Sequence, residues 1–185
     1  FVNRSYSLPN WVNENTLVVL CSYSGNTEET LSCYSQCIEK KIKPLIISSG
    51  GYLLKEAKNN SFNYMQLDSG IQPRAAFGFS SSLLILALMK MQLIDPVYVR
   101  LIHESSVSLK EMSKYLSKPS DDNMAIDLAY KLFNKDAIIY GSTLTDVVAN
   151  RFKCQLAENS KVLASHNIIP EQNHNEIEAY ENQNN

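Results

Sequence analysis

The sequence predicts an α/β protein in which helices cover a parallel β-sheet. Residues 16–21 and 44–47 form short runs that are apolar on both faces, as strands buried in a parallel sheet are. Each run is followed by turn residues and then by a helical pattern, and a third strand-like run covers residues 62–67. This alternation of strand and helix is typical of a parallel sheet with covering helices.

Charges and turn residues predict the two helices between these strands. A helix is expected from Glu28 to about Lys41, because an acidic pair lies in its first turn and a lysine pair in its last, as the helix dipole favours. A shorter helix is expected over residues 52–59, directly after the turn residues 48–51.

Two longer helices are expected after a loop at residues 69–74. Residues 75–91 are hydrophobic nearly all round, above all from Leu83 to Met91, which predicts a buried helix. We interpret this stretch as core or dimer interface rather than as a cofactor site. A second helix is expected over residues 96–116.

The pattern starts again after a polar segment. Residues 117–123 are polar and contain Pro119, which favours a linker. The elements expected beyond it are a helix at 124–133, a strand at 137–140, a helix at 145–158 and a strand at 162–165. We therefore expect a first domain at residues 1–118, a linker at 119–123 and the start of a second domain at 124–185.

Composition indicates an ordinary globular protein without an electrostatic surface for nucleic acid or an anionic membrane. Of the 185 residues, 44% are apolar and 19% are charged, and the formal net charge is −2. The sequence has no CxxC pair and no Cys/His cluster with zinc spacing, so we expect no metal and no other cofactor. Buried reduced thiols are expected at Cys21, Cys33, Cys37 and Cys154, which favours the cytoplasm.

The segment Ser22-Tyr-Ser-Gly-Asn-Thr27 carries the most information about function. It follows a buried strand, so it lies at the carboxyl edge of the sheet, where open α/β proteins bind ligands. Gly25 permits a tight turn, and the helix after it directs free N–H groups at this point. Ser22, Ser24 and Thr27 add hydroxyl groups, which together predict a phosphate cradle. The alternative is a helix cap with spare serines, since these residue types are common caps.

Four stretches resemble a known family in the same order along the chain. Residues 22–31, Ser-Tyr-Ser-Gly-Asn-Thr-Glu-Glu-Thr-Leu, resemble the sugar-phosphate loop of the SIS family, and specifically its phosphoglucose/phosphomannose isomerase branch. The other three stretches are residues 73–78, 157–161 and 170–177. Residues 6–11 also fit the approach to this loop, so the resemblance covers essentially the whole chain.

The resemblance implies a three-layer αβα SIS fold with a parallel sheet and two tandem SIS domains. It also implies an aldose–ketose isomerase that interconverts glucose 6-phosphate with fructose 6-phosphate through a cis-enediol, with mannose 6-phosphate as a second substrate. This chemistry needs a base to move a proton between adjacent carbons, a group that stabilises the enediolate and an acid/base that opens the sugar ring. It requires no metal or redox cofactor.

Carried over to this sequence, the resemblance assigns a role to each candidate site residue. The substrate phosphate would be bound by Ser22, Ser24 and Thr27. Arg74 would lie near the enediolate oxygens, where a guanidinium holds its charge and binds two oxygens. Glu158 would shuttle the proton. His174 would open the ring and would come from the neighbouring subunit of a homodimer.

The residues alone leave alternatives open for these roles. Arg74 also fits a surface loop, and Glu158 also fits a solvated side chain or a pair with Lys161. His174, which lies among asparagines, also fits a surface hydrogen-bonding group. Glu176 is a rival carboxylate, and only the resemblance selects Glu158 over it.

Other polar positions are expected to be structural. The turn Gly141-Ser-Thr143 fits a helix cap better than a ligand contact. His103 and His166 are expected to have structural roles.

Two parts of the family's active site are expected to lie outside residues 1–185. They are an earlier strand with a Gly-Gly-Ser loop and a C-terminal portion that brings a lysine to the substrate. For this sequence by itself we therefore expect weak binding and poor turnover. The alternative function is a non-catalytic SIS module that senses a phosphosugar.

Overall fold

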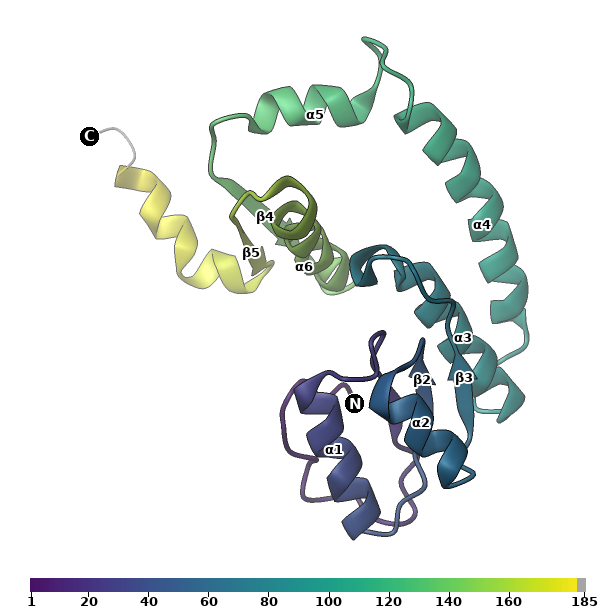
Figure 1. Cartoon of the computed structure of the whole chain (residues 1–185). Helices are drawn as coiled ribbons and strands as arrows, with labels where there is room; N and C mark the ends of the chain where they lie inside the picture. Colours follow the sequence, from purple (N-terminus) through teal and green to yellow (C-terminus); the bar gives the residue numbers. More distant parts are fainter. Residues whose placement is uncertain (183–185) are drawn as a thin grey trace. The chain divides into compact units, whose positions relative to one another are not determined.

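The computed structural model describes residues 1–182 (Figure 1) and divides into two compact units, one of residues 1–107 and one of the described residues from 108 onward. Each unit contains its own parallel sheet. Within the described residues, none of the helices has the combined length and apolar character needed to cross a membrane.

The first unit is built on a three-stranded parallel sheet in the order β1-β2-β3. The strands are β1 (Val19–Cys21), β2 (Leu45–Ser48) and β3 (Tyr64–Gln66). Val19 pairs with Leu45, and Ile46 pairs with Tyr64. The crossovers are α1 (Glu28–Glu39), which packs on β1, and α2 (Gly51–Asn59), which packs on β2 and β3. The predicted α/β class with a parallel sheet is confirmed.

The core of this unit lies between β2 and its two helices. All four residues of β2 are buried, and Cys37 of α1 and Leu53 of α2 are 0% exposed. Burial raises the pKa of the Cys37 thiol to about 11. The prediction of buried thiols is confirmed at Cys33 and Cys37.

The other two cysteines differ from the prediction. Cys21 is exposed and Cys154 is half-buried. Cys21 ends β1, and because successive side chains of a strand point to opposite faces, it points away from the face on which its neighbour Leu20 is buried.

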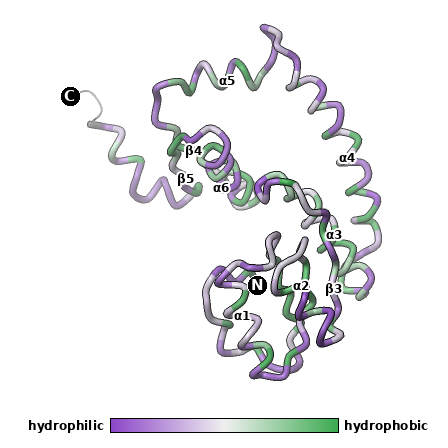
Figure 2. The backbone as a smooth tube through the Cα atoms, viewed as in Figure 1, coloured by the Kyte–Doolittle hydropathy of each residue, from purple (hydrophilic) through white to green (hydrophobic). Residues whose placement is uncertain are grey.

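The helix expected to be buried is only partly covered. It forms α3 (Phe77–Lys90), after a 3-10 turn at Pro73–Ala75, and only Ala87 is buried. Phe77 is 61% exposed. Figure 2 shows apolar positions along α3, and a helix that is apolar all round cannot bury every face against one small sheet. The expectation of a buried helix is therefore wrong for this chain by itself.

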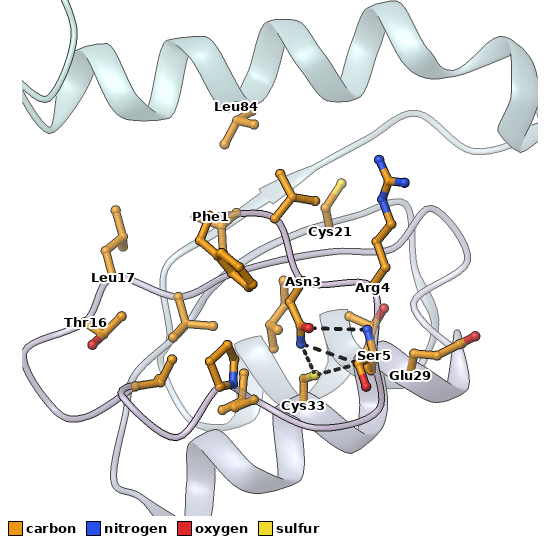
Figure 3. Close-up of a pocket in the computed structure, with 18 of the residues that line it drawn as sticks. Phe1, Asn3, Arg4, Ser5, Thr16, Leu17, Cys21, Glu29, Cys33 and Leu84 are labelled. Carbon is orange, nitrogen blue, oxygen red and sulfur yellow. Dashed lines mark hydrogen bonds between the residues drawn. The ribbon is translucent and has the colours of Figure 1, made fainter. Parts of the chain in front are cut away.

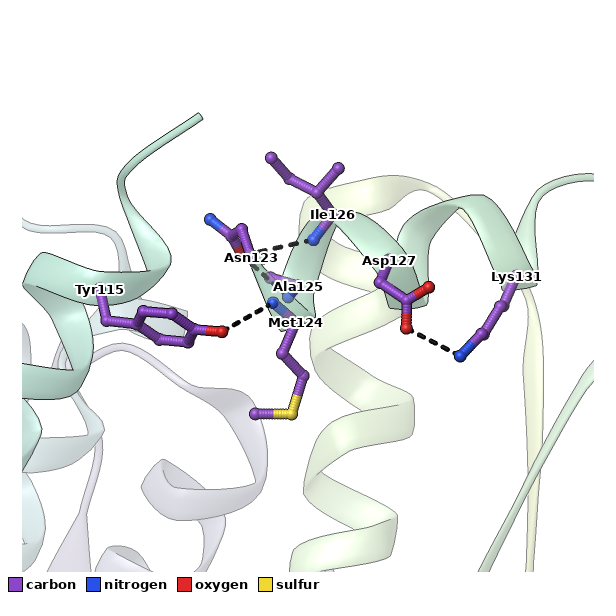
Figure 4. Close-up of polar contacts among 7 residues, drawn as sticks. All are labelled: Tyr115, Asn123, Met124, Ala125, Ile126, Asp127 and Lys131. Atoms are coloured by element: carbon purple, nitrogen blue, oxygen red, sulfur yellow. Dashed lines mark hydrogen bonds and ion pairs between the residues drawn. The ribbon is translucent and has the colours of Figure 1, made fainter. Parts of the chain in front are cut away.

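The helix α4 (Val97–Leu116) crosses the boundary between the two units, and none of its residues is buried. The polar segment after it is an ordered connection. The Asn123 side chain is 1% exposed and donates to the carbonyls of Leu116 at 2.8 Å and Lys118 at 2.7 Å. Its Oδ1 accepts the N–H of Ala125 at 2.9 Å, which caps α5 (Met124–Leu132), as Figure 4 shows.

The second unit contains the parallel strands β4 (Ala137–Gly141) and β5 (Ala164–Ile168). The helix α6 (Asp146–Gln155) connects them and packs on both, and a π-helical turn at Leu156–Ser160 continues it. Two 3-10 segments, Glu171–His174 and Glu176–Asn182, follow β5. Strand, helix and strand again occur in the predicted order.

Candidate functional site

The loop after β1, residues 22–27, is here called the hydroxyl loop, and its own side chains close it by hydrogen bonds. Ser22 is buried, and its Oγ lies 2.7 Å from Thr27 Oγ1. The same Ser22 Oγ accepts the N–H of Gly25 at 3.1 Å, and Ser24 Oγ accepts the N–H of Asn26 at 3.2 Å. Thr27 directly precedes α1 and makes no side-chain cap bond to it. The loop therefore holds three hydroxyl groups at the start of a helix.

A second loop, residues 48–51 after β2, lies directly against the first. The Gly25 carbonyl accepts the N–H of Leu53 at 3.1 Å, and Asn26 Oδ1 accepts the N–H of Tyr52 at 2.9 Å. The N-terminal turns of α1 and α2 are thus joined at the carboxyl edge of the sheet, where their dipoles favour an anion. The sequence Ser-Ser-Gly-Gly predicts a turn at this point. That this turn lies beside the hydroxyl loop follows only from the pairing of β1 with β2.

Arg74 lies in the 3-10 turn after the third strand-end loop. It is half-buried, and its Nη1 donates to Gln72 Oε1 at 3.5 Å. The first unit therefore carries Ser22, Ser24, Thr27 and Arg74.

Glu158 and His174 belong to the second unit, apart in sequence and in element from the hydroxyl loop. Glu158 is exposed in the π-helical turn after α6. Lys161 Nζ donates to the Glu158 backbone carbonyl at 2.7 Å, so this hydrogen bond does not involve the Glu158 carboxylate. His174 is exposed at the end of the 3-10 segment after β5.

Glu176, the rival carboxylate, is engaged in a hydrogen-bond network. It accepts from Tyr140 Oη of β4 and from Asn167 Nδ2 of β5, and from Tyr180 Oη at 3.1 Å. The hydrogen bond from Tyr140, followed by that from Asn167, lowers the pKa of Glu176. A carboxylate whose ionised form is held by several donors is a poor proton acceptor, which favours a structural role for Glu176.

The turn after β4, at Gly141–Thr143, is also held by local hydrogen bonds. The Ser142 N–H donates to Thr145 Oγ1 at 2.9 Å. His166 Nε2 of β5 lies 2.7 Å from Asp146 Oδ1 in the first turn of α6. The first contact joins the end of β4 to the start of α6, and the second joins the middle of β5 to the first turn of α6, which supports the structural interpretation of this turn and of His166.

An apolar cavity of about 760 Å³ lies along the free side of β1 in the first unit. Figure 3 shows Phe1, Leu17 and Leu84 on its wall, with Asn3 hydrogen-bonded to Cys33 Sγ at 3.5 Å. Thr27 is the residue that the cavity shares with the hydroxyl loop. Because neither Ser22 nor Ser24 lines it, we separate this cavity from the candidate site.

Comparison with known proteins identifies relatives over nearly the whole sequence. Residues 121–185 match the model of the bacterial phospho-glucose isomerase C-terminal SIS domain. The chain is 44% identical over 178 residues to the bifunctional phosphoglucose/phosphomannose isomerase of Caldicellulosiruptor bescii, a match that covers 95% of this chain and 52% of that protein. It is 32% identical to the D-glucosamine-6-phosphate 4-epimerase of Sulfolobus acidocaldarius, over 97% of this chain and 55% of that protein.

Solved structures share the fold. A crystal structure described as a putative phosphosugar isomerase from Salmonella typhimurium matches with a TM-score of 0.67 and 16% identity, over 92% of this chain and 52% of that one. The chain spans about half the length of the relatives it matches. Matching sequence and fold together confirm the resemblance and the αβα SIS class: the chain belongs to the SIS-domain sugar isomerase family and is related to its bifunctional phosphoglucose/phosphomannose isomerases.

Proposed function

We propose that the protein interconverts glucose 6-phosphate and mannose 6-phosphate with fructose 6-phosphate through a cis-enediol. The observation that carries this proposal is the position of the hydroxyl loop with Ser22, Ser24 and Thr27. The loop follows the end of β1 and is hydrogen-bonded to the first turn of α2. The relatives named as phosphoglucose/phosphomannose isomerases support the reaction class.

The proposed binding mode places the phosphate of the sugar at the hydroxyl loop. The N-terminal turns of α1 and α2 attract the anion, and the three hydroxyls donate to its oxygens. Thr27 Oγ1 and Ser22 Oγ, now bonded to each other at 2.7 Å, would each turn toward a phosphate oxygen. Binding then exchanges one internal hydrogen bond for two that are charge-assisted.

The proposed chemistry moves protons within the sugar and needs no external electrons. Glu158 takes the proton from one carbon of the open-chain sugar and returns it to the neighbouring carbon, while the hydroxyl proton passes from one oxygen of the enediol to the other, so that aldose and ketose interconvert. Arg74 stabilises the enediolate oxygens as charge develops on them. His174 exchanges a proton with the ring oxygen, an acid/base role that histidine side chains commonly take in enzymes.

We propose that the two groups of residues meet in a homodimer, with His174 reaching the site of the neighbouring subunit. The exposure of Glu158 and His174 supports this, because residues that serve a substrate or a partner chain are left uncovered by their own unit. We also propose the domain division 1–118, 119–123 and 124–185, with the ordered Asn123 connection between the domains. The buried thiols Cys33 and Cys37 support a reducing compartment such as the cytoplasm.

A coupled assay tests the proposal. Formation of fructose 6-phosphate from glucose 6-phosphate and from mannose 6-phosphate is followed in the presence of EDTA, with this chain and with the full-length protein that carries it. We expect turnover by the full-length protein and a loss of roughly 10²-fold or more in its Glu158→Gln variant. Unchanged turnover in Glu158→Gln would contradict the mechanism.

The second candidate is a non-catalytic module that binds a phosphosugar. The hydroxyl loop supports it equally, since that loop only binds. Binding of fructose 6-phosphate without turnover of either aldose would favour this candidate. Glucosamine 6-phosphate belongs in the same assay, because a relative at 32% identity is a 4-epimerase of that sugar.

A further inference from the structure

Tyr23 lies between Ser22 and Ser24, and its backbone joins the first strand-end loop to the second. Its carbonyl accepts the N–H of Ser49 at 3.0 Å and Ser49 Oγ at 2.6 Å. Ser48 Oγ lies 3.4 Å from the same oxygen. The main chain of the hydroxyl loop is therefore fixed to the loop after β2.

The side chain of Tyr23 reaches the third strand-end loop, which follows β3. Its hydroxyl donates to the Asp68 carbonyl at 3.0 Å and accepts the N–H of Ile71 at 3.0 Å. These two backbone groups are three residues apart, the spacing at which a direct hydrogen bond closes an ordinary β-turn. The phenol oxygen is inserted between them, so the shape of this bend depends on Tyr23.

The bend is coupled to Arg74 through a short and stiff piece of chain. Pro73 has a ring-restricted φ, and it begins the 3-10 turn that contains Arg74. The N–H of Ala75 donates to the Gln72 carbonyl at 2.8 Å, which closes this turn. A displacement of Ile71 is therefore passed on to Arg74 with few free dihedral angles to absorb it.

We infer that Tyr23 is a positioning residue, which sets the distance between Arg74 and the phosphate bound at the hydroxyl loop. The inference rests on the proposed function, in which Arg74 stabilises the enediolate while Ser22 and Thr27 hold the phosphate. Tyr23 thereby couples the two ends of the substrate. The hydroxyl loop that contains Tyr23 binds the phosphate, and the Tyr23 hydroxyl shapes the bend before Arg74, which acts at the reacting carbons.

The Tyr23→Phe variant isolates this role, because it removes one oxygen and keeps the ring. Without that oxygen, the Asp68 carbonyl and the Ile71 N–H can bond to each other directly, which draws the bend together and moves Arg74. A misplacement of about 1 Å in a catalytic group costs up to about 10²-fold in rate. We expect kcat to fall about 10- to 100-fold, while the Kd of inorganic phosphate stays within about twofold.

Two further variants separate positioning from a general loss of stability. Tyr34 Oη donates to Glu56 Oε2 at 3.3 Å between α1 and α2, so Tyr34→Phe loses a comparable hydrogen bond away from the loops. We expect this control to keep its kcat even if its Tm falls. If Tyr23 acts through Arg74, then Tyr23→Phe added to Arg74→Gln lowers kcat by less than about twofold more.

The experiment measures kcat and KM of the full-length protein and its variants, together with calorimetric Kd values for inorganic phosphate and fructose 6-phosphate. An unchanged kcat in Tyr23→Phe, or effects of Tyr23→Phe and Arg74→Gln that multiply in the double variant, would overturn the inference.

The binding measurements distinguish this outcome from failure of the proposed function. If the unchanged protein does not isomerise either sugar, the proposed function fails, and fructose 6-phosphate affinity becomes the readout. Weaker binding of fructose 6-phosphate in Tyr23→Phe, with unchanged phosphate binding and no further loss in the double variant, would support the positioning role. Equal losses for both ligands would overturn it.

Discussion

Gly25 and Gly51 lie at a backbone-to-backbone contact between the first two strand-end loops. A β-carbon on Gly25 would lie 1.9 Å from the Gly50 carbonyl oxygen, and one on Gly51 would lie 2.2 Å from the Ser24 carbonyl oxygen. Both glycines also have positive φ, +69° and +68°. At these two glycines the loops therefore meet through main-chain atoms, with no room for a β-carbon.

Gly25→Ala is expected to destabilise the first unit strongly. The left-handed backbone costs about 1–2 kcal/mol for a residue with a β-carbon, and the overlap with Gly50 adds to that cost. Urea unfolding measures the loss. Gly78→Ala is the matched control, because a β-carbon there meets nothing within 4 Å in helix α3, and we expect it to be neutral or to stabilise by up to about 1 kcal/mol. Equal stability of the two variants would contradict the interlocked loops.

Ser22→Ala is expected to weaken phosphate binding. The variant loses a donor to the anion and also the acceptor for the Gly25 N–H, which shapes the loop. A hydrogen bond to a charged group contributes about 1.5–3 kcal/mol, or roughly 10- to 100-fold in Kd. Calorimetry with fructose 6-phosphate measures the change. Ser35→Ala, which removes a hydroxyl bonded to the Leu31 carbonyl on α1, should leave the Kd unaltered.

Asn123→Ala is expected to cost about 1–3 kcal/mol in the free energy of unfolding, because it removes the side chain that donates to the Leu116 and Lys118 carbonyls and caps α5. Asn123→Asp should retain the cap acceptor but lose both donated bonds and place a carboxylate oxygen against the two carbonyl oxygens, so its loss should be at least as large. Thermal unfolding checks the order. Asp121→Ala, at an exposed position in the same segment, serves as the control and should behave like the unchanged protein.

Alkaline pH is expected to destabilise the first unit through Cys37. Burial, with a smaller effect of Cys33, raises the pKa of this thiol from 9.0 to about 11, so its contribution to stability is complete below pH 9 and is lost as pH rises from 9 to 11. The buried Tyr34 hydroxyl, whose pKa burial raises to about 12, continues the decline above pH 10. Unfolding in urea at pH 8, 9, 10 and 11 measures the slope. Cys37→Ala should flatten it between pH 9 and 11, and an identical slope would refute this origin.

The order and type of the elements could be predicted from the sequence because strand and helix alternate with clear turn residues. The strands at 16–21, 44–47 and 62–67 correspond to β1, β2 and β3, and the hydroxyl loop lies at the predicted strand end. These features depend on local pattern, which one sequence displays.

Features that depend on contacts between distant segments could not be predicted in this way. The expected burial of α3 failed because a pattern shows that a helix is apolar but not how much neighbouring structure is available to cover it. The roles of Gly51 and of the Tyr23 hydroxyl were hidden for the same reason: each depends on a loop more than 20 residues away along the chain. The roles of Glu158 and His174 remain predictions from the family resemblance.

The contact of Gly25 with Gly51 also limits how the specificity of the protein can be redesigned. Because main-chain atoms of the two loops touch at Gly25 and Gly51, no larger side chain at either glycine can widen or narrow the proposed phosphate site by a small step. Directed evolution toward other sugars should therefore accumulate substitutions in residues 68–72 and leave both glycines untouched, so the phosphate end of the ligand stays constant while the sugar end diversifies.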